Sequence, residues 1–277
     1  MISPLRLAAL LAASLLVALP AAAQQKPYEP QIGQAGKDVI WVPTPDEVVD
    51  RMLTMAQVTK DDVVYDLGAG NGKIAIAAAK KFGARATGIE YNPDMAKHAQ
   101  GNVVAAGVSD RARILQGDIF ATNFSEATVV TMYLLPGLNM RLRPTLLAMK
   151  PGTRVVSHSF TMEDWEADEI SSMDGRRAYF WVVPAQVGGS WQLEAGSDKR
   201  ELNFEQRFQK IEGTVNLGAA TQGGLRDASL RGFNIGFAYV DAAGVLRSFT
   251  GRVTNGRMEG SWRGDNGTEG RWTATKK

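Results

Sequence analysis

A run of alternating glycines beside an acidic residue is the part of this sequence best suited to chemistry. The segment VVYDLGAGNGKIAI (63–76) places Asp66 at the end of a β-branched run, with Gly68, Gly70 and Gly72 directly after it. Glycine lets the backbone approach a ligand closely because it has no Cβ. The pattern therefore indicates a small molecule bound beside a carboxylate.

The spacing of these glycines excludes the common phosphate-binding loops. A P-loop needs four residues before Gly-Lys-Ser/Thr, whereas three residues separate Gly68 from Gly72-Lys73, and Ile74 follows. A dinucleotide fingerprint needs G-x-G-x-x-G, and the third glycine comes one residue early. A carboxylate at Asp66 would also repel a pyrophosphate. It would favour S-adenosylmethionine, which carries an α-ammonium and a sulfonium and has no phosphate.

Two further acids fall where that cofactor would need them. Glu90 ends the next strand-like run about twenty residues after the glycines, a position from which an acid accepts from ribose hydroxyls. Asp118, in LQGDIF, could accept from the adenine amino group. Acids at strand ends can also be solvated or cap helices. Because Asp66, Glu90 and Asp118 each come at the end of a strand-like run, the three acids together predict a cofactor site.

The surrounding elements must bring these acids together. The sequence predicts strands at 63–67, 86–90, 112–118, 127–135, 153–160 and 178–184, and helices at 72–82, 93–107 and 138–149. Continuous Val/Ile runs separated by helices are typical of strands buried on both faces. We therefore expect an α/β fold with a Rossmann-like, doubly wound parallel sheet, whose ligand lies at the carboxyl ends of the strands.

A change of character after AQVGGS (185–190) predicts a second, all-β unit. Helical periodicity ends, glycines become frequent, and short alternating runs appear. One strand face is expected to carry Leu202, Phe204 and Phe208. Another is expected to carry Phe233, Ile235, Phe237 and Tyr239, and strands are expected to close at Gly213, Gly251, Gly260 and Gly270. This is typical of a small antiparallel barrel or sandwich. Three tryptophans there could pack its core or line a pocket: Trp191, Trp262 and Trp272.

Composition excludes several classes of function. The 277 residues carry a net charge of +2 with mixed signs, which gives no reason to expect a nucleic-acid partner. The absence of cysteine rules out disulfides and thiol chemistry, and two histidines without paired spacing predict no metal site. The oligomeric state is left open.

The amino-terminal residues have the layout of a secretory signal. Arg6 precedes the apolar run Leu7–Leu19, and Ala21-x-Ala23 follows. We expect cleavage near Ala23 and an exported, periplasmic protein with no membrane span after removal of the signal; an uncleaved anchor is the alternative. The expected organisation is a signal peptide (1–23), a linker (24–39), an S-adenosylmethionine-binding domain (40–187) and a β-rich domain (188–277).

Four segments carry a family resemblance: WVPTPDEVVDRML, YDLGAGNGKIAIAAAK, ATVVTMYLLPGLNMRLRPTLLAMKPGTRVVSHSF and the later DW. They resemble class I, seven-strand S-adenosylmethionine-dependent methyltransferases over roughly 40–184. More narrowly, they resemble small protein-lysine methyltransferases, including archaeal broad-specificity enzymes and mitochondrial ones that act on membrane carriers and ATP synthase. The resemblance implies that 42–45 lies over the cofactor. It implies a cofactor site made of Thr44, Asp66, Gly68, Ala69, Gly70, Gly72, Glu90, Tyr91, Asp118 and Ile119.

Methyl transfer to lysine asks mainly for alignment and exclusion of water. A lysine amine must arrive neutral, and burial beside a sulfonium disfavours the ammonium, so no dedicated base is required. Tyr133, after the fourth strand, is the candidate for contacting the amine, although it could simply close the core. His158 could be a base or a structural histidine. A small-molecule methyltransferase and a binding protein without turnover are the alternative functions.

Overall fold

Five neighbouring parallel strands, from β3 at one edge to β5, form most of the first sheet, whose order is β3-β2-β1-β4-β5-β7-β6. The computed structural model describes residues 28–218 and 221–277, so the predicted signal peptide and the start of the predicted linker lie outside the described residues. The strands of this sheet are β1 (Val63–Leu67), β2 (Arg85–Glu90), β3 (Ala112–Gln116), β4 (Val129–Met132), β5 (Arg154–His158), β6 (Glu169–Met173) and β7 (Arg176–Val182). Strand β7 pairs antiparallel with β5, and β6 pairs antiparallel with β7. The predicted doubly wound, Rossmann-like sheet is therefore confirmed, with the difference that β7 and β6 make it a mixed sheet and not a purely parallel one.

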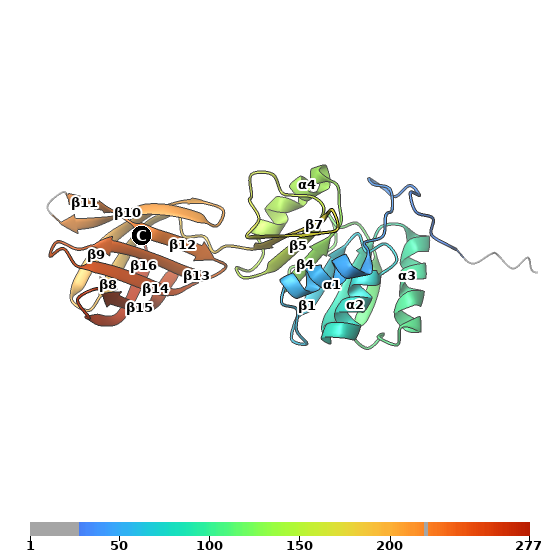
Figure 1. Ribbon diagram of the computed structural model, residues 1–277, viewed down its shortest axis with the longest axis horizontal. Coiled ribbons are helices and arrows are strands. Elements are labelled where there is room, and N and C mark those ends of the chain that lie inside the picture. The colour runs from blue at the N-terminus through green and yellow to red at the C-terminus, as the bar shows by residue number, and fades with distance from the viewer. Residues whose placement is uncertain (1–27, 219–220) are drawn as a thin grey trace, which may run out of the picture.

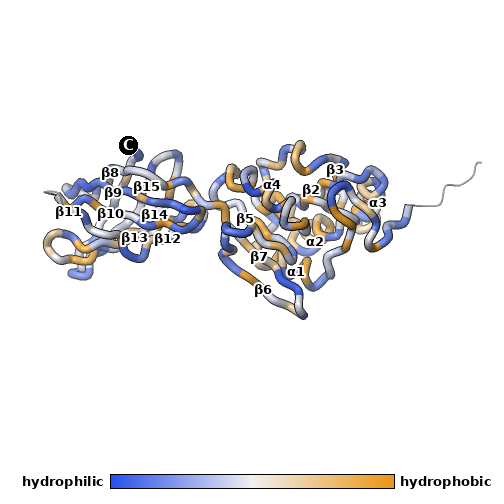
Figure 2. Tube along the Cα trace, turned by 90° about the horizontal axis from the view of Figure 1, so that it is seen from above, coloured by the Kyte–Doolittle hydropathy of each residue, from blue (hydrophilic) through white to orange (hydrophobic). Residues whose placement is uncertain are grey.

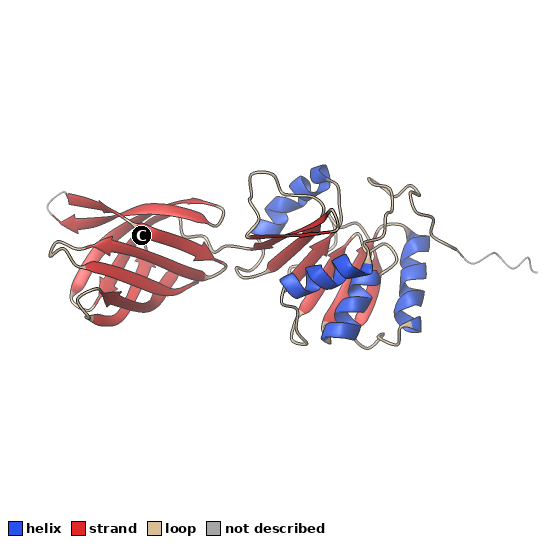
Figure 3. Ribbon diagram, in the orientation of Figure 1, coloured by secondary structure: helices blue, strands red, loops and turns tan. Residues whose placement is uncertain are grey.

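Four helices cover the two faces of this sheet: α1 (Asp46–Met55), α2 (Lys73–Phe82), α3 (Pro93–Ala105) and α4 (Pro136–Leu147). The first three contribute to one buried apolar cluster, and α4 contributes to a separate cluster on the opposite face. Figure 3 shows this division of the helices between the two sides. We call the part from α1 to β7 the mixed-sheet unit.

Two elements of this unit were not among those predicted. Strand β6 has a mostly exposed, polar pattern without clear alternation, because it is the edge of the sheet and buries neither face fully. Helix α1 does carry a signal, since Val48, Val49, Met52 and Leu53 form a buried stripe at helical spacing. By contrast, the predicted start of α3 is confirmed, because the Asn92 side chain accepts from the amides of Asp94 and Met95.

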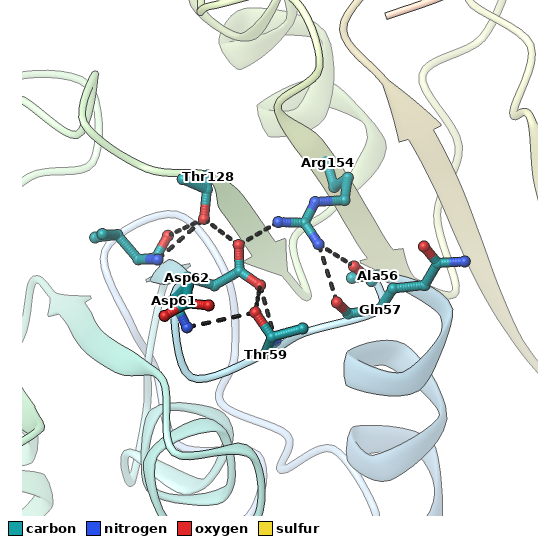
Figure 4. Close-up of polar contacts among 8 residues, drawn as sticks. Ala56, Gln57, Thr59, Asp61, Asp62, Thr128 and Arg154 are labelled. Carbon is teal, nitrogen blue, oxygen red and sulfur yellow. Dashed lines mark hydrogen bonds and ion pairs between the residues drawn. The ribbon is translucent and has the colours of Figure 1, made fainter.

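A polar network holds together the strand ends that lie away from the glycine loop (Figure 4). Arg154 of β5 forms an ion pair with Asp62 and donates to the carbonyl of Ala56 at 2.6 Å. Thr128, before β4, donates to Asp62 at 2.7 Å. Burial would raise the pKa of Asp62, but hydrogen bonds from Thr128, the Thr59 amide and Arg154 hold this pKa below its usual value. The beginnings of β1, β4 and β5 are thus fixed together.

The second unit is a nine-strand antiparallel, nearly closed barrel with the order β11-β10-β9-β8-β16-β15-β14-β13-β12. Its strands are β8 (Gly189–Ala195), β9 (Asp198–Arg207), β10 (Lys210–Gly218), β11 (Thr221–Gly224), β12 (Arg226–Arg231), β13 (Asn234–Val240), β14 (Leu246–Thr254), β15 (Arg257–Gly264) and β16 (Glu269–Lys276). Side chains fill its interior: Trp191 and Trp272 are fully buried in the barrel core, and Trp262 packs against it. The prediction that these tryptophans pack in the core of the barrel is therefore confirmed.

The predicted strand endings in the barrel were wrong. Gly213, Gly251 and Gly260 lie inside strands, not at their ends. A Cβ at Gly251 would lie 2.7 Å from the Trp272 ring, and one at Gly260 would lie 1.9 Å from the Thr250 carbonyl oxygen. These glycines therefore let strands and rings approach closely where the sheet curves. Phe208 and Phe233 were also misplaced, because both lie in turns outside the strands.

The barrel lies beside the mixed-sheet unit, joined to it by a narrow connection (Figures 1 and 2). The Ala185 amide of this connection donates to the Gly232 carbonyl at 2.8 Å. The ring of Phe233 lies against Gly152, where a Cβ would approach it to 2.9 Å. Within 28–218 and 221–277, no helix combines the length and apolarity needed to span a membrane.

Candidate active site

Asp66 is a buried carboxylate at the end of the central strand. It is 2% exposed, and the Thr131 hydroxyl of the neighbouring strand β4 donates to it at 2.8 Å. Burial raises the pKa of Asp66 to about 7; the hydrogen bond from Thr131 opposes this rise, and the charge of Glu90 adds to it. A buried acid of this kind gains most by facing a cation.

Glu90 is oriented by backbone amides at the end of β2. Its Oε2 accepts from the Gly70 amide at 2.9 Å, and its Oε1 accepts from the Asn92 amide at 2.9 Å. Each carboxylate oxygen keeps a further lone pair, so the side chain can still accept from ligand hydroxyls. The glycine loop and the second acid are therefore preorganised together.

The glycine loop is shaped by left-handed backbone and by a tryptophan packed on it. Gly68 and Gly70 have φ values of 80° and 53°. A Cβ at Gly70 would lie 2.4 Å from the indole nitrogen of Trp41. Gly72 also has a left-handed φ, but it begins α2 and packs against Ala99 and Ile114. The loop thus needs glycine at 70 for the close approach of Trp41.

Trp41 ends a short hairpin, residues 33–41, that we call the N-terminal strap. The Gly33 amide donates to the Trp41 carbonyl at 2.8 Å, and the Trp41 amide donates to the Gln34 carbonyl at 2.9 Å. At the tip of this strap, the Lys37 ammonium donates to Asp118 at 2.7 Å and lies 4.6 Å from the centre of the Tyr91 ring. Hydrogen bonds from Lys37 and the Phe120 amide lower the pKa of Asp118.

Two small cavities lie between the strap and the strand ends, with volumes of about 100 and 40 Å³. Trp41, Gly68 and Tyr133 border both of them. Sites for small-molecule ligands usually measure about 300–1,000 Å³. Both cavities are smaller than this range, and residues of the strap border each of them.

The cavities gather nearly all the predicted cofactor residues. The first is bordered by Gly68, Glu90, Tyr91, Asp118 and Ile119, and the second by Thr44, Asp66, Gly68, Ala69 and Gly70. Gly72 borders neither. The prediction missed Lys37, Val39 and Trp41 of the strap, and Leu134 and Leu138 beyond β4. The strap residues carry no local signal, because they reach the site only through the fold.

The donor set fits S-adenosylmethionine in chemistry. The buried carboxylate of Asp66 suits an ammonium, and the fixed carboxylate of Glu90 suits ribose hydroxyls. Asp118 suits an amino group, provided that Lys37 leaves it. The residues present therefore fit the cofactor once the strap shifts.

Aromatic side chains form the side of the site beyond Asp66. The ring of Tyr133 lies 4.0 Å from the ring of His158 and 6.1 Å from that of Phe160, centre to centre. Within the described ranges, no hydrogen bond joins the Tyr133 hydroxyl to another residue. The Thr44 hydroxyl lies 3.2 Å from Nδ1 of His158. Burial, aided by the charge of Arg176, lowers the pKa of His158 to about 4, so this imidazole is neutral near pH 7.

Comparison with known proteins shows the family. The model of the ANTKMT methyltransferase domain matches residues 66–169. A protein-lysine N-methyltransferase from Saccharolobus islandicus is 48% identical over 151 residues, which are 52% of this chain and 94% of that protein. A mouse lysine N-methyltransferase named for its action on ATP synthase is 28% identical over 149 residues, 53% of this chain and 60% of that protein.

One similar solved structure contains the demethylated form of the cofactor. An RNA methyltransferase from Salinibacter ruber, in complex with S-adenosyl-L-homocysteine, is 50% identical, with a TM-score of 0.52 over 53% of this chain and 96% of that one. The demethylated cofactor in that structure agrees with the donor set described above. The chain therefore belongs to the ANTKMT methyltransferase family, and it is a class I methyltransferase whose cofactor is S-adenosylmethionine.

Proposed function

We propose that the chain methylates lysine side chains of a protein substrate. The observation that carries this substrate class is the 48% identity to the S. islandicus enzyme over 94% of its length. The alignment uses about half of this chain, and the family model matches residues 66–169, which lie in the mixed-sheet unit. The barrel is an addition to the methyltransferase fold.

The residues beyond Asp66 suit an amine acceptor. Tyr133, His158 and Phe160 form a mostly apolar wall, along which the methylenes of a lysine side chain can pack. The free hydroxyl of Tyr133 can accept from, or donate to, the incoming nitrogen. Such a wall also favours the neutral amine over the ammonium, because it replaces water.

No residue of the site is required to remove the proton during transfer. Bound S-adenosylmethionine supplies a methyl group on a sulfonium, so the new N–C bond forms as the C–S bond breaks and sulfur keeps the electron pair. The amine loses its proton to solvent beforehand. His158 is a poor base for this purpose, because its pKa of about 4 is far below that of an amine.

RNA is the second candidate acceptor, because the S. ruber structure is described as an RNA methyltransferase at 50% identity. The charges that border the cavities favour protein instead. Lys73 is paired with Asp46 at 2.7 Å. A surface for RNA needs clustered cations that are free for phosphates. Cofactor binding would release only Lys37 from Asp118, and one released lysine is not such a cluster.

The test is methyl incorporation from labelled S-adenosylmethionine into an envelope protein extract and, separately, into total RNA. We expect label on protein lysine, identified by mass spectrometry, and none with Asp66→Ala. Label in RNA, on a small metabolite, or on carboxylates would overturn the lysine assignment. The assignment of S-adenosylmethionine as the cofactor would stand. Cofactor binding without any transfer would favour a binding protein.

We also infer from the amino-terminal sequence that the protein is exported to the periplasm and cleaved near Ala23. The support is the apolar run 7–19 followed by Ala21-x-Ala23. Cell fractionation with sequencing of the first residue tests this. A first residue near Gln24 in the periplasmic fraction is expected, and an intact chain in the membrane fraction would indicate an anchor instead.

A further inference from the structure

The turn between β9 and β10 of the barrel packs on the mixed-sheet unit. The ring of Phe208 stacks on that of Trp165 at 6.1 Å and 27°, and the guanidinium of Arg143 lies 5.4 Å from the Phe208 ring centre. Trp165 itself is fully buried in the apolar cluster that contains α4. Phe208 thus joins the core of the neighbouring unit, not the core of the barrel.

Phe208 occupies this place in an unfavourable backbone conformation. Arg207 and Lys210 are paired directly, so Phe208 and Gln209 form a two-residue hairpin turn. The φ angle of Phe208 is 55°, in the left-handed region where glycine or asparagine is usual in such turns. An aromatic residue persists in strained backbone when its surroundings determine it. The packing of its ring on Trp165 is a sufficient reason.

The other residues of the turn contact the same segment, which follows Trp165. The side-chain Nε2 of Gln209 donates to the Glu166 carbonyl at 2.7 Å and to the Asp168 carboxylate at 3.2 Å. Lys210 forms an ion pair with Glu166 at 2.6 Å. Arg207 completes the contact through Asp164, at 3.1 Å. All four residues of the turn, 207–210, therefore grip residues 164–168.

The gripped segment continues into the acceptor side of the site. Residues 159–168 connect β5 to β6, and Phe160 near their start stacks on Tyr133 at 6.1 Å and 22°. Helix α4 holds this first half, because Asn139 donates to the Thr161 carbonyl at 3.1 Å and Arg143 to that of Met162 at 3.2 Å. We call residues 159–168 the acceptor loop. One half of it is fixed by α4. The other half is held by β7, because Trp181 donates to the Trp165 carbonyl at 2.8 Å and the Val182 amide donates to Asp168 at 2.7 Å, and the turn of the barrel adds its contacts to these.

We propose that the β9–β10 turn of the barrel is a positioning element for the methyl acceptor. By holding residues 164–168, the turn fixes the acceptor loop and thereby the placement of Phe160 against Tyr133. This inference rests on the proposed function, because it assigns the Tyr133 side of the site to the acceptor. We expect binding of S-adenosylmethionine to be independent of the turn, because Asp66, Glu90 and Asp118 lie outside both the turn and the acceptor loop.

The first variant, Phe208→Asn, removes the ring but suits the left-handed turn, so the barrel keeps its fold. We expect backbone hydrogen exchange in 159–168 to become about tenfold faster. Methyl transfer to the envelope extract should fall at least about fivefold, while the Kd for S-adenosylmethionine changes by less than about twofold. Phe208→Tyr keeps the stacking, so its rates of hydrogen exchange and methyl transfer should equal those of wild type.

An ion-pair exchange tests the same grip without touching the ring. Lys210→Glu should accelerate exchange in the acceptor loop, and Lys210→Glu combined with Glu166→Lys should reverse the effect. The matched control is Lys199→Glu. It breaks an ion pair of 2.9 Å between Lys199 and Glu194, which are both exposed and both belong to the barrel. This control should leave loop exchange and transfer unchanged.

The outcomes separate this proposal from the proposed function. If wild type labels RNA or a metabolite and not lysine, the lysine assignment fails, and the same variants are compared on the acceptor that is labelled. Unchanged exchange in 159–168 in Phe208→Asn would overturn the grip. Faster exchange with undiminished transfer would overturn the positioning role and reduce the turn to a structural contact.

Discussion

Lys37 donates a hydrogen bond of 2.7 Å to Asp118, 81 residues further along the chain. Asp118 is the acid assigned to the adenine amino group, so the ammonium of the strap and the cofactor would compete for one carboxylate. The side chains of Lys37 and Asp118 are 37% and 29% exposed, which places the pair at the surface of the site. Its strength is therefore modest and screened by salt.

Lys37→Met should tighten the binding of S-adenosylmethionine, because it frees Asp118 and loosens the strap. An ion pair of this exposure is weak, so we expect only about a two- to fivefold lower Kd by calorimetry. Lys81→Met, which breaks a surface pair with Asp50, is the matched control and should leave the Kd unchanged. Weaker binding by Lys37→Met would mean that the strap holds the cofactor and does not compete with it.

Cofactor affinity should rise with pH around neutrality. The pKa of Asp66 is about 7, so below that pH the carboxyl is protonated and cannot pair with the cofactor ammonium. The ionised fraction grows from about one tenth at pH 6 to about one half at pH 7, which predicts about fivefold tighter binding. Asp66→Asn should bind more weakly and lose this dependence. A flat profile in wild type would place the ammonium elsewhere.

His158 should make the protein sensitive to acid. In the unfolded chain its pKa is about 6.5, whereas in the folded protein it is about 4, so the unfolded state binds more protons between these values. Stability should therefore fall as pH drops from about 6.5 to 4, by about 3 kcal/mol from this group. Chemical denaturation of wild type and His158→Gln, compared at pH 7 and pH 4.5, isolates the effect. Equal pH dependence of the two proteins would contradict it.

Tyr133→Phe should lower turnover and spare cofactor binding. It removes only the hydroxyl that faces the acceptor, so we expect about a tenfold lower rate and an unchanged Kd for S-adenosylmethionine. The wild-type rate should rise with pH as neutral amine becomes available. His158→Gln should keep the shape of that profile, and a rate that collapses in this variant would identify the imidazole as a base.

Local patterns in the sequence were sufficient for the elements that build the cofactor side. The run 63–67 became β1, and the alanine-rich stretch after Gly72 became α2. Asn92 and Pro93 start α3 as predicted, because capping and the fixed φ of proline act within a few residues. The acids Asp66 and Glu90 were placed correctly at strand ends for the same reason.

Tertiary structure alone decided the features that join distant segments. Lys37 of the strap contacts Asp118, 81 residues further along the chain, and the strap residues have no periodicity that would predict this contact. In the barrel, Phe208 continued the alternation of Leu202 and Phe204, yet it lies in a turn and packs on Trp165. Alternation records that an apolar side chain will be buried, but not which core will bury it.

The sequence by itself thus determined the α/β class, the cofactor and the acids suited to hold it, because glycine spacing and strand-end carboxylates express local backbone chemistry. Only the tertiary structure decided that Trp41 lies on Gly70 and that the barrel grips the acceptor loop. Both contacts join segments that lie far apart in the sequence. Their geometry depends on packing and register over long separations, which no short stretch of sequence encodes.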